Sequence, residues 1–156
     1  PQELRFRDAA LALARHADFA KRMVNSGRLS APSVYDTPLS TPDRDAWGGG
    51  AKLGGPLPDA PLLDRAGRPV WLLDALGGEP TVLHVPNGGA PPETPGLRRL
   101  VIGEDLIDSQ GHFARRFDAT PGASYLVRPD QHLAARWREA RPEEIAAARR
   151  RLLGWG

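Results

Sequence analysis

The chain has 156 residues, of which 40% are hydrophobic and 26% charged, and it contains no cysteine. This composition is typical of a globular protein with one core, and the missing cysteines exclude disulfides, thiolate metal sites and thiol redox chemistry. Its 21 basic and 19 acidic side chains leave a formal net charge of +2, which does not favour a nucleic-acid surface, and no apolar run is long enough to predict a membrane span.

The N-terminal stretch predicts one amphipathic helix over residues 3–25. Its apolar stripe recurs at steps of three and four: Phe6, Ala10, Leu13, Ala17, Ala20 and Val24. Gly27 is placed to end the helix in a left-handed conformation. So wide a stripe needs a partner surface. The chain opens at Pro1 without a signal-peptide pattern, so we expect an internal piece of a longer cytoplasmic protein.

Residues 28–58 have neither a helical nor a strand period and are rich in proline and glycine. We interpret them as an extended connector that lies on, or leads between, two domains. Gly48 to Gly55 form a glycine cluster, but no strand precedes it and Pro56 follows it. A phosphate-binding loop needs a helix N-terminus after it, so the pattern favours a linker.

From residue 60 the pattern predicts strands, then a final helix. The expected elements are a hairpin of 62–63 and 70–73 around a turn at 64–68, a buried strand at 81–85, a strand at 100–102, a short helix at 111–117, an antiparallel hairpin of 125–127 and 133–137, and a helix that begins at Pro142 and ends near Gly154.

The four histidines give only weak signals for a site. None has a metal-binding spacing; they are His16, His84, His112 and His132. We expect His16 to face solvent and His84 to be a hydrogen-bonded core residue. A small enzyme that uses His112 or His132 stays open as a rival interpretation.

Arginine and tryptophan clusters also have simple structural interpretations. Arg149, Arg150 and Arg151 fall in the last turns of the final predicted helix, and Arg136, Arg138 and Arg141 are near them in sequence. An anion or nucleic-acid surface is the alternative, but glutamates dilute the patch, so we expect a solvated face whose cations complement the helix dipole. The tryptophans share no period and are expected to pack in the core or an interface: Trp47, Trp71, Trp137 and Trp155.

The segment from Arg128 to Trp137, with its Arg-Pro-Asp-Gln-His start, resembles the last hairpin in the C-terminal domain of flavin-dependent aromatic-ring monooxygenases. That class includes phenol hydroxylases and hydroxyphenylpropionate hydroxylases. Residues 58–71 and 117–129 resemble other parts of the same domain. Residues 19–30, with residues 38–40, resemble the helix and loop that leave the preceding flavin domain.

The resemblance implies an α/β fold with a thioredoxin-like mixed sheet and no redox chemistry. Residues 86–96 would hold the reactive cysteines and first helix of a thioredoxin, but they contain four prolines, three glycines and no cysteine. We therefore expect coil there. Pro121 lies near the position of the thioredoxin cis-proline, and its isomer stays open.

The flavin machinery has no counterpart in this sequence. There is no strand-linked Gly-x-Gly-x-x-Gly and no Gly-Asp or Asp-Gly pair. We therefore assign no catalytic, cofactor-binding or metal-binding residue, and expect no cofactor in this segment. We do not expect the segment to be an enzyme by itself.

The resemblance implies two parts with a structural function. Residues 1–57 would be a trailing helix and connector from a flavin-bearing body, and residues 58–156 a redox-inactive docking domain. The parent, from a bacterium, would use FAD, NAD(P)H and O2 to hydroxylate an aromatic ring. The expected partners are its own flavin domain and a second subunit, without nucleic acid or membrane. A free-standing thioredoxin-like binding module is the alternative.

Overall fold

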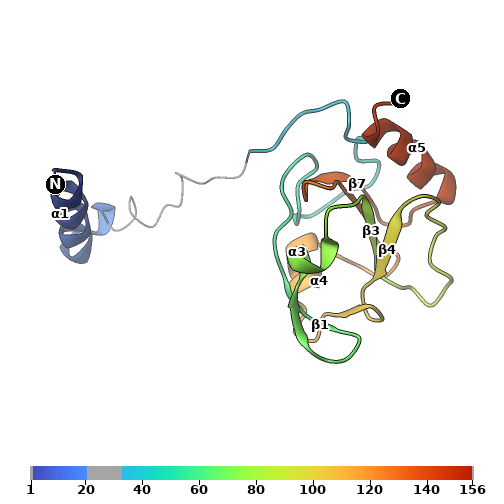
Figure 1. The fold of residues 1–156 in the computed structure, drawn as a ribbon, viewed down its shortest axis with the longest axis horizontal. Coiled ribbons are helices and arrows are strands. Elements are labelled where there is room, and N and C mark those ends of the chain that lie inside the picture. The colour runs from blue at the N-terminus through green and yellow to red at the C-terminus, as the bar shows by residue number, and fades with distance from the viewer. Residues whose placement is uncertain (1, 21–32, 156) are drawn as a thin grey trace. The chain divides into compact units, whose positions relative to one another are not determined.

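A computed structural model describes residues 2–20 and 33–155 (Figure 1). Contacts divide the chain into one unit within residues 1–32 and another formed by residues 33–156. The elements in chain order are α1 (Gln2–His16), β1 (Pro61–Asp64), β2 (Pro69–Trp71), α3 (Leu72–Leu76), β3 (Thr81–His84), β4 (Arg98–Val101), β5 (Leu106–Ile107), α4 (His112–Phe117), β6 (Ser124–Val127), β7 (Leu133–Trp137) and α5 (Pro142–Leu152).

The first unit contains α1, whose regular pattern is interrupted at Ala17. Among the described residues of this unit, the exposed large apolar side chains are Leu11, Leu13 and Phe19. The end of the helix predicted over residues 3–25, with Val24 and Gly27, lies outside the described residues, as do the side chains of Phe6 and Ala10.

The second unit is a mixed α/β domain built on a four-stranded sheet of order β4-β3-β6-β7. Strands β3 and β4 are parallel, and β6 runs antiparallel to both β3 and β7. All four residues of β3 are buried, because this strand has a neighbour on each side and packed elements on both faces. The central strand expected at 81–85 and the hairpin of 125–127 with 133–137 are confirmed.

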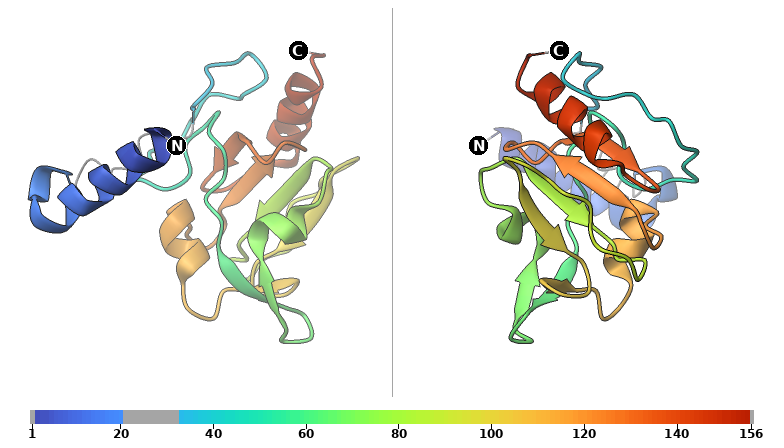
Figure 2. Two further views of the ribbon diagram at one scale, coloured as in Figure 1. Left: turned by 60° about the vertical axis from the view of Figure 1, so that its left-hand side comes forward. Right: turned by 90° about the vertical axis from the view of Figure 1, so that its right-hand side faces the viewer.

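Side chains alternate between two cores on opposite faces of this sheet. Val82 and Leu126 pack under α5 with Ile145. Leu83 and Tyr125 point to the other face, where α3, α4 and β1 contribute the larger core. The two views of Figure 2 show α5 apart from α3 and α4, with the sheet between them. Because successive side chains of a strand point to opposite faces of the sheet, each face has its own hydrophobic core.

The second sheet is small and antiparallel, in the order β2-β1-β5. The predicted hairpin is confirmed: Gly67 has φ of 77°, and the Asp64 carboxylate accepts the N–H groups of Ala66 and Arg68 at 2.9 Å each. The predicted second strand runs too far, however. Residues 72–73 open α3, because the Asp59 carboxylate accepts the N–H of Leu73 at 3.1 Å and Leu72 is fully buried.

The remaining predicted elements are also present. The helix expected at 111–117 is α4, and Phe113 and Phe117 stack with their centroids 4.3 Å apart. Helix α5 begins at Pro142, and Glu144 accepts the N–H of Arg141 at 3.0 Å. Residues 86–96 are coil, as expected. Strand β5 and helix α3 are the elements that the sequence pattern did not indicate.

The proline- and glycine-rich segment of residues 33–57 lies against the edge of the domain sheet. It has no helix or strand, as expected, but contacts group it with residues 58–156. The N–H groups of Thr41 and Gly54 donate to the carbonyls of Ala134 and Leu133, at 2.8 Å each, and the N–H of Leu133 donates to the carbonyl of Gly55 at 2.9 Å. We call residues 33–57 the edge cover, since β7 is the last strand of its sheet. The structural division at 32/33 therefore differs from the expected boundary at 57/58.

Two arginines of β7 and the loop after it fix the edge cover in place. Arg136 and Arg138 lie over the ring of Trp47, with guanidinium carbons 4.5 and 3.8 Å from the ring centroid. Arg136 also forms a bidentate ion pair with Asp43, the shortest contact being 2.6 Å. Arg138 reaches Asp118 at 2.6 Å. Its hydrogen bond, with that of the Gly48 N–H, holds the pKa of the Asp118 carboxyl below its ordinary value.

The glycine cluster permits close approach of the edge cover to the core. Gly50 has φ of 78°, and a Cβ placed there would lie 2.5 Å from the backbone carbon of Phe117. Gly54 has φ of 73°, and a Cβ placed there would lie 2.1 Å from the carbonyl oxygen of Tyr35. These glycines are required by backbone packing within the domain.

We predict that Trp47→Ala lowers the free energy of unfolding by about 2 to 3 kcal/mol, because it removes both arginine contacts and the packing on Tyr125. Trp71→Ala is the control: that side chain is 50% exposed, so its loss is expected to cost less than about 1 kcal/mol. Urea unfolding followed by circular dichroism measures both. Equal losses would contradict the role given to Trp47.

Gly50→Ala and Gly67→Ala form a second matched pair. Both residues have nearly the same positive φ, but nothing lies within 4 Å of a Cβ at Gly67. Gly67→Ala is expected to cost about 1 kcal/mol from backbone strain alone. Gly50→Ala adds a clash with α4 and should cost about 2 kcal/mol more. Melting temperatures that fall equally would show that the edge cover can move away.

Candidate functional site

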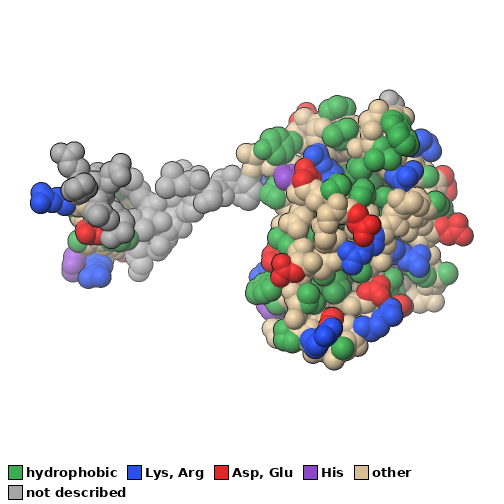
Figure 3. All heavy atoms as spheres, viewed as in Figure 1, with side chains coloured by type: hydrophobic (Ala, Val, Ile, Leu, Met, Phe, Trp, Pro, Cys, Tyr) green, Lys and Arg blue, Asp and Glu red, His purple; other side chains and the backbone are tan. Residues whose placement is uncertain are grey.

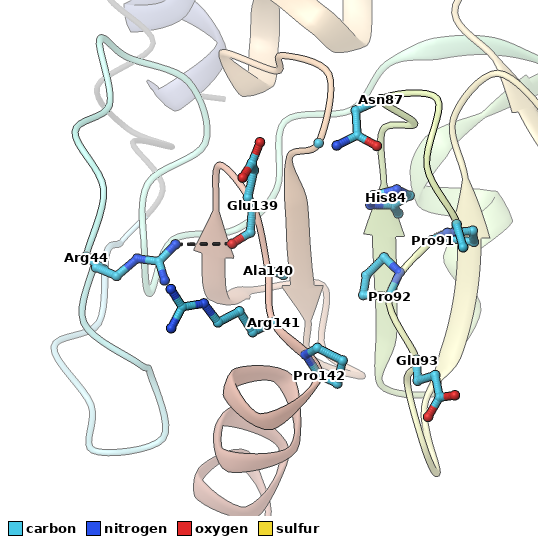
Figure 4. A pocket seen from close by; sticks show the side chains of 12 residues that line it. Arg44, His84, Asn87, Pro91, Pro92, Glu93, Glu139, Ala140, Arg141 and Pro142 are labelled. Atoms are coloured by element: carbon cyan, nitrogen blue, oxygen red, sulfur yellow. Dashed lines mark hydrogen bonds between the residues drawn. The ribbon is translucent and has the colours of Figure 1, made fainter.

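A hollow of about 720 Å³ opens at the carboxyl end of β3, beside the start of α5 (Figure 4). The carboxyl ends of strands are where open α/β sheets bind ligands, since side chains and loops diverge there. Its volume is in the range of small-molecule pockets. The lining comes from four segments of the domain: Arg44; His84, Asn87, Ala90, Pro91, Pro92 and Glu93; Gly122; and Glu139, Ala140, Arg141 and Pro142.

His84 is the buried polar residue of this hollow. It is the last residue of β3 and only 4% exposed. Its Nδ1 lies 2.9 Å from the Oγ of Ser124, the residue opposite in β6. Its Nε2 is buried without a hydrogen-bond partner among the described residues. The expectation of a hydrogen-bonded core histidine is confirmed, but one ring nitrogen is left unsatisfied.

The contact with Ser124 indicates which nitrogen carries the proton. Ser124 is fully buried, and the Nδ1 of His84 is the one partner of its hydroxyl within the described residues. If the hydroxyl donates to Nδ1, its proton is satisfied and Nε2 carries the ring N–H. The opposite tautomer would leave both the hydroxyl proton and Nε2 unpaired. The favoured arrangement therefore presents one free N–H donor.

Burial keeps this imidazole neutral. Desolvation lowers the pKa of His84 below its ordinary value of 6.5, and the positive charge of Arg99 lowers it further, while Glu104 acts in the opposite sense. A neutral imidazole can donate one hydrogen bond to a ligand oxygen.

In Figure 4 the guanidinium groups of Arg44 and Arg141 lie near each other to the left of His84, and the side chain of Arg141 extends toward Arg44. Arg44 is already engaged: it pairs with Asp45 and Glu144, and it donates to the carbonyl of Glu139 at 3.1 Å. In the described structure, no carboxylate or carbonyl oxygen accepts a hydrogen bond from the guanidinium of Arg141. Arg141 therefore has donors available for a ligand.

The lining also includes the polar residues Asn87, Glu93 and Glu139, and the remainder of the wall is apolar. Prolines and alanines supply it, in the coil after β3 and at the start of α5. The Asn87 amide nitrogen lies 3.4 Å from where a Cβ of Gly122 would stand, so a larger residue at Gly122 would push against the amide. The carboxylates of Glu93 and Glu139 point away from the two guanidinium groups in Figure 4.

The other histidines do not join this site. The two ring nitrogens of His112 contact Gln110 and Arg115. The ring of His132 packs on the ring of Tyr35, with the two centroids 5.6 Å apart. His16, in the first unit, is exposed. No group of three or more potential metal ligands occurs among residues 2–20 and 33–155.

The remaining sequence candidates have structural environments. Trp137 is buried in the core under α5, whereas Trp71 and Trp155 are 50% and 69% exposed. Arg149, Arg150 and Arg151 occupy the last turn of α5 as predicted. Acidic and basic side chains intermingle on the face of the domain seen in Figure 3. None of the described helices is both long and apolar enough to cross a membrane.

Sequence reasoning missed Arg44 and Asn87 of the hollow, and it noted Arg141 only as a neighbour of the basic cluster in the final helix. One signal could have found Asn87, since it follows a strand correctly predicted as central and buried. The arginines carry no such signal, because they come from segments 43 and 54 residues away from Asn87 along the chain.

Comparison with known proteins gives structural matches alone. No protein-family model matches the chain, and no curated protein matches it. The solved structure of the flavin-dependent monooxygenase PieE, in complex with FAD and substrate, matches 100% of this chain with 25% identity and a TM-score of 0.69. Aklavinone-11 hydroxylase, with FAD and aklavinone, matches 93% at 21% identity and a TM-score of 0.64. RebC with bound 7-carboxy-K252c matches 100% at 20% identity and a TM-score of 0.58.

The chain spans less than a third of each of these proteins: 31% of PieE, 32% of aklavinone-11 hydroxylase and 29% of RebC. Its fold is therefore shared with one part of flavin-dependent monooxygenases. This agrees with the class that the sequence resemblance indicated.

The buried His84 predicts a pH dependence of stability. Its folded-state pKa is lowered, so the stability of the neutral ring is fully present above the unfolded pKa near 6.5. It is lost as the pH falls below that value toward the folded pKa, by at most about 1.4 kcal/mol per pH unit. Urea unfolding at pH 7.5 and 5.5 should show a larger loss in the natural chain than in His84→Gln. The same slope in both would refute this assignment.

Proposed function

We propose that this chain is the C-terminal docking region of an FAD-dependent aromatic-ring hydroxylase and is not catalytic by itself. The observation that carries the proposal is the match to PieE, which covers the whole chain at 25% identity but only 31% of that monooxygenase. The flavin site and the reaction would belong to the part of the parent that this chain does not contain.

The sheet supports a thioredoxin-like assignment for residues 33–156. Strand order β4-β3-β6-β7, with β6 antiparallel to its neighbours and α5 after the last strand, is consistent with the thioredoxin-like mixed sheet that the resemblance implies. The coil over 86–96 stands where the redox-active helix of a thioredoxin begins. With no cysteine in the chain, a structural role is the simplest account of such a domain.

The first unit supports a docking role for the N-terminal part. Leu11 and Leu13 of α1 are 45% and 51% exposed, and Phe19, just after this helix, is 59% exposed. Exposed apolar groups of this kind mark contact surfaces. In the proposal they pack on the flavin-bearing body of the same protein or on a second subunit.

The proposal predicts that removing the domain leaves the flavin site intact. We would truncate the protein encoded by the full reading frame just before Ser33, because contacts place the start of the domain there. The truncated protein should keep bound FAD and part of its NAD(P)H- and O2-dependent hydroxylation. It should lose thermal stability or change its oligomeric state, since inter-domain interfaces typically bury roughly 600–1,500 Å².

Two controls make this experiment decisive. The 156-residue chain alone should not quench FAD fluorescence, and a full-length Trp71→Ala variant should behave like the natural protein. Loss of FAD from a folded truncated protein would overturn the docking role. A reading frame without a flavin domain would instead favour a free-standing binding module.

A further inference from the structure

We propose that the hollow at the carboxyl end of β3 is a binding site for a small carboxylate with an apolar body. The inference goes beyond the docking role and does not depend on it, because every residue involved belongs to the domain itself. Three observations carry it: the size and lining of the hollow, an unsatisfied buried donor and an arginine with unused donors.

The unsatisfied donor is the ring N–H of His84. A buried polar group without a partner lowers stability, so proteins retain few of them. His84 lines the hollow and is only 4% exposed, and its Nε2 has no hydrogen-bond partner among the described residues. A ligand oxygen that accepts this hydrogen bond would remove the cost, which gives binding a specific source of free energy.

Arg141 supplies the charge complement. Arg141 lines the hollow, and its guanidinium donates to no oxygen of the described chain. Its own backbone N–H and carbonyl are held by Glu144 at 3.0 Å each, so the start of α5 fixes the base of the side chain. A guanidinium with free donors binds a carboxylate through two parallel hydrogen bonds.

The walls select the body of the ligand. Pro91, Pro92 and Pro142 present rigid apolar surfaces, with Ala90 and Ala140 beside them. A volume of about 720 Å³ is suited to one small molecule. A multiply charged anion such as a nucleotide would meet the negative charges of Glu93 and Glu139 at the rim. A monocarboxylate on an apolar body fits both parts of the lining.

The test uses benzoate as the probe and the 156-residue chain as the protein. Two-dimensional NMR follows the ring signals of His84 and the side-chain amide of Asn87 during titration. We expect saturable shifts of both. Benzamide, which has the same shape without the charge, should bind at least about tenfold more weakly.

Arg141→Gln and Arg150→Gln form the matched pair of variants. Both arginines belong to the same end of the chain and are exposed, but Arg150 does not line the hollow. The first change should weaken benzoate binding by about tenfold, and the second should leave it unchanged. Because neither side chain is buried, both variants should fold, and their spectra check this directly.

Each other outcome overturns the proposal. No saturable shift at His84 would mean that the hollow is not a site for this chemistry. Equal weakening in both variants would indicate general attraction of anions to the basic helix end. Equal binding of benzamide would remove the carboxylate from the recognition. The test needs no flavin, so it succeeds or fails separately from the docking role.

Discussion

The contact of Arg136 and Arg138 with Trp47 connects parts of the domain that lie 89 and 91 residues apart in sequence. Each arginine also holds an acidic partner, Asp43 or Asp118. One cluster therefore fixes the irregular edge cover, the end of α4 and the last strand at the same time. Charge-assisted hydrogen bonds and an aromatic surface compensate for the absence of regular structure here. Residues 33–57 form an ordered part of the fold without a helix or strand because this cluster orders them.

The sheet shows how much of the fold the sequence could predict. The apolar run predicted the buried strand 81–84, and the turn residues between apolar runs predicted both hairpins. The proline at its first position predicted the start of α5. The sequence pattern left open whether residues 28–58 lie on a domain or lead between two, because proline and glycine are typical of linkers. Local pattern cannot reveal that Gly50 is needed for its approach to Phe117, since that contact spans 67 residues.

The candidate site was less predictable than the fold, for a related reason. His84 was correctly expected to be hydrogen bonded in the core, yet its unsatisfied nitrogen depends on Ser124, 40 residues away. The coil after β3 forms one wall of the hollow. Four prolines and three glycines in residues 86–96 predicted the coil, but the walls opposite come from the loops around Arg44 and Arg141. Only the tertiary structure brings these segments together around the hollow.

The edge cover has a consequence for how pieces of this protein should be cut. It satisfies backbone groups of β7 that would otherwise stand open at the side of the sheet. An uncovered edge strand is a template for pairing with another chain. A fragment that starts at residue 58 would carry such an edge, so it would tend to assemble through β7 and to aggregate. Self-association of that fragment would reflect where the chain was cut, and a fragment that starts at residue 33 would keep the natural surface.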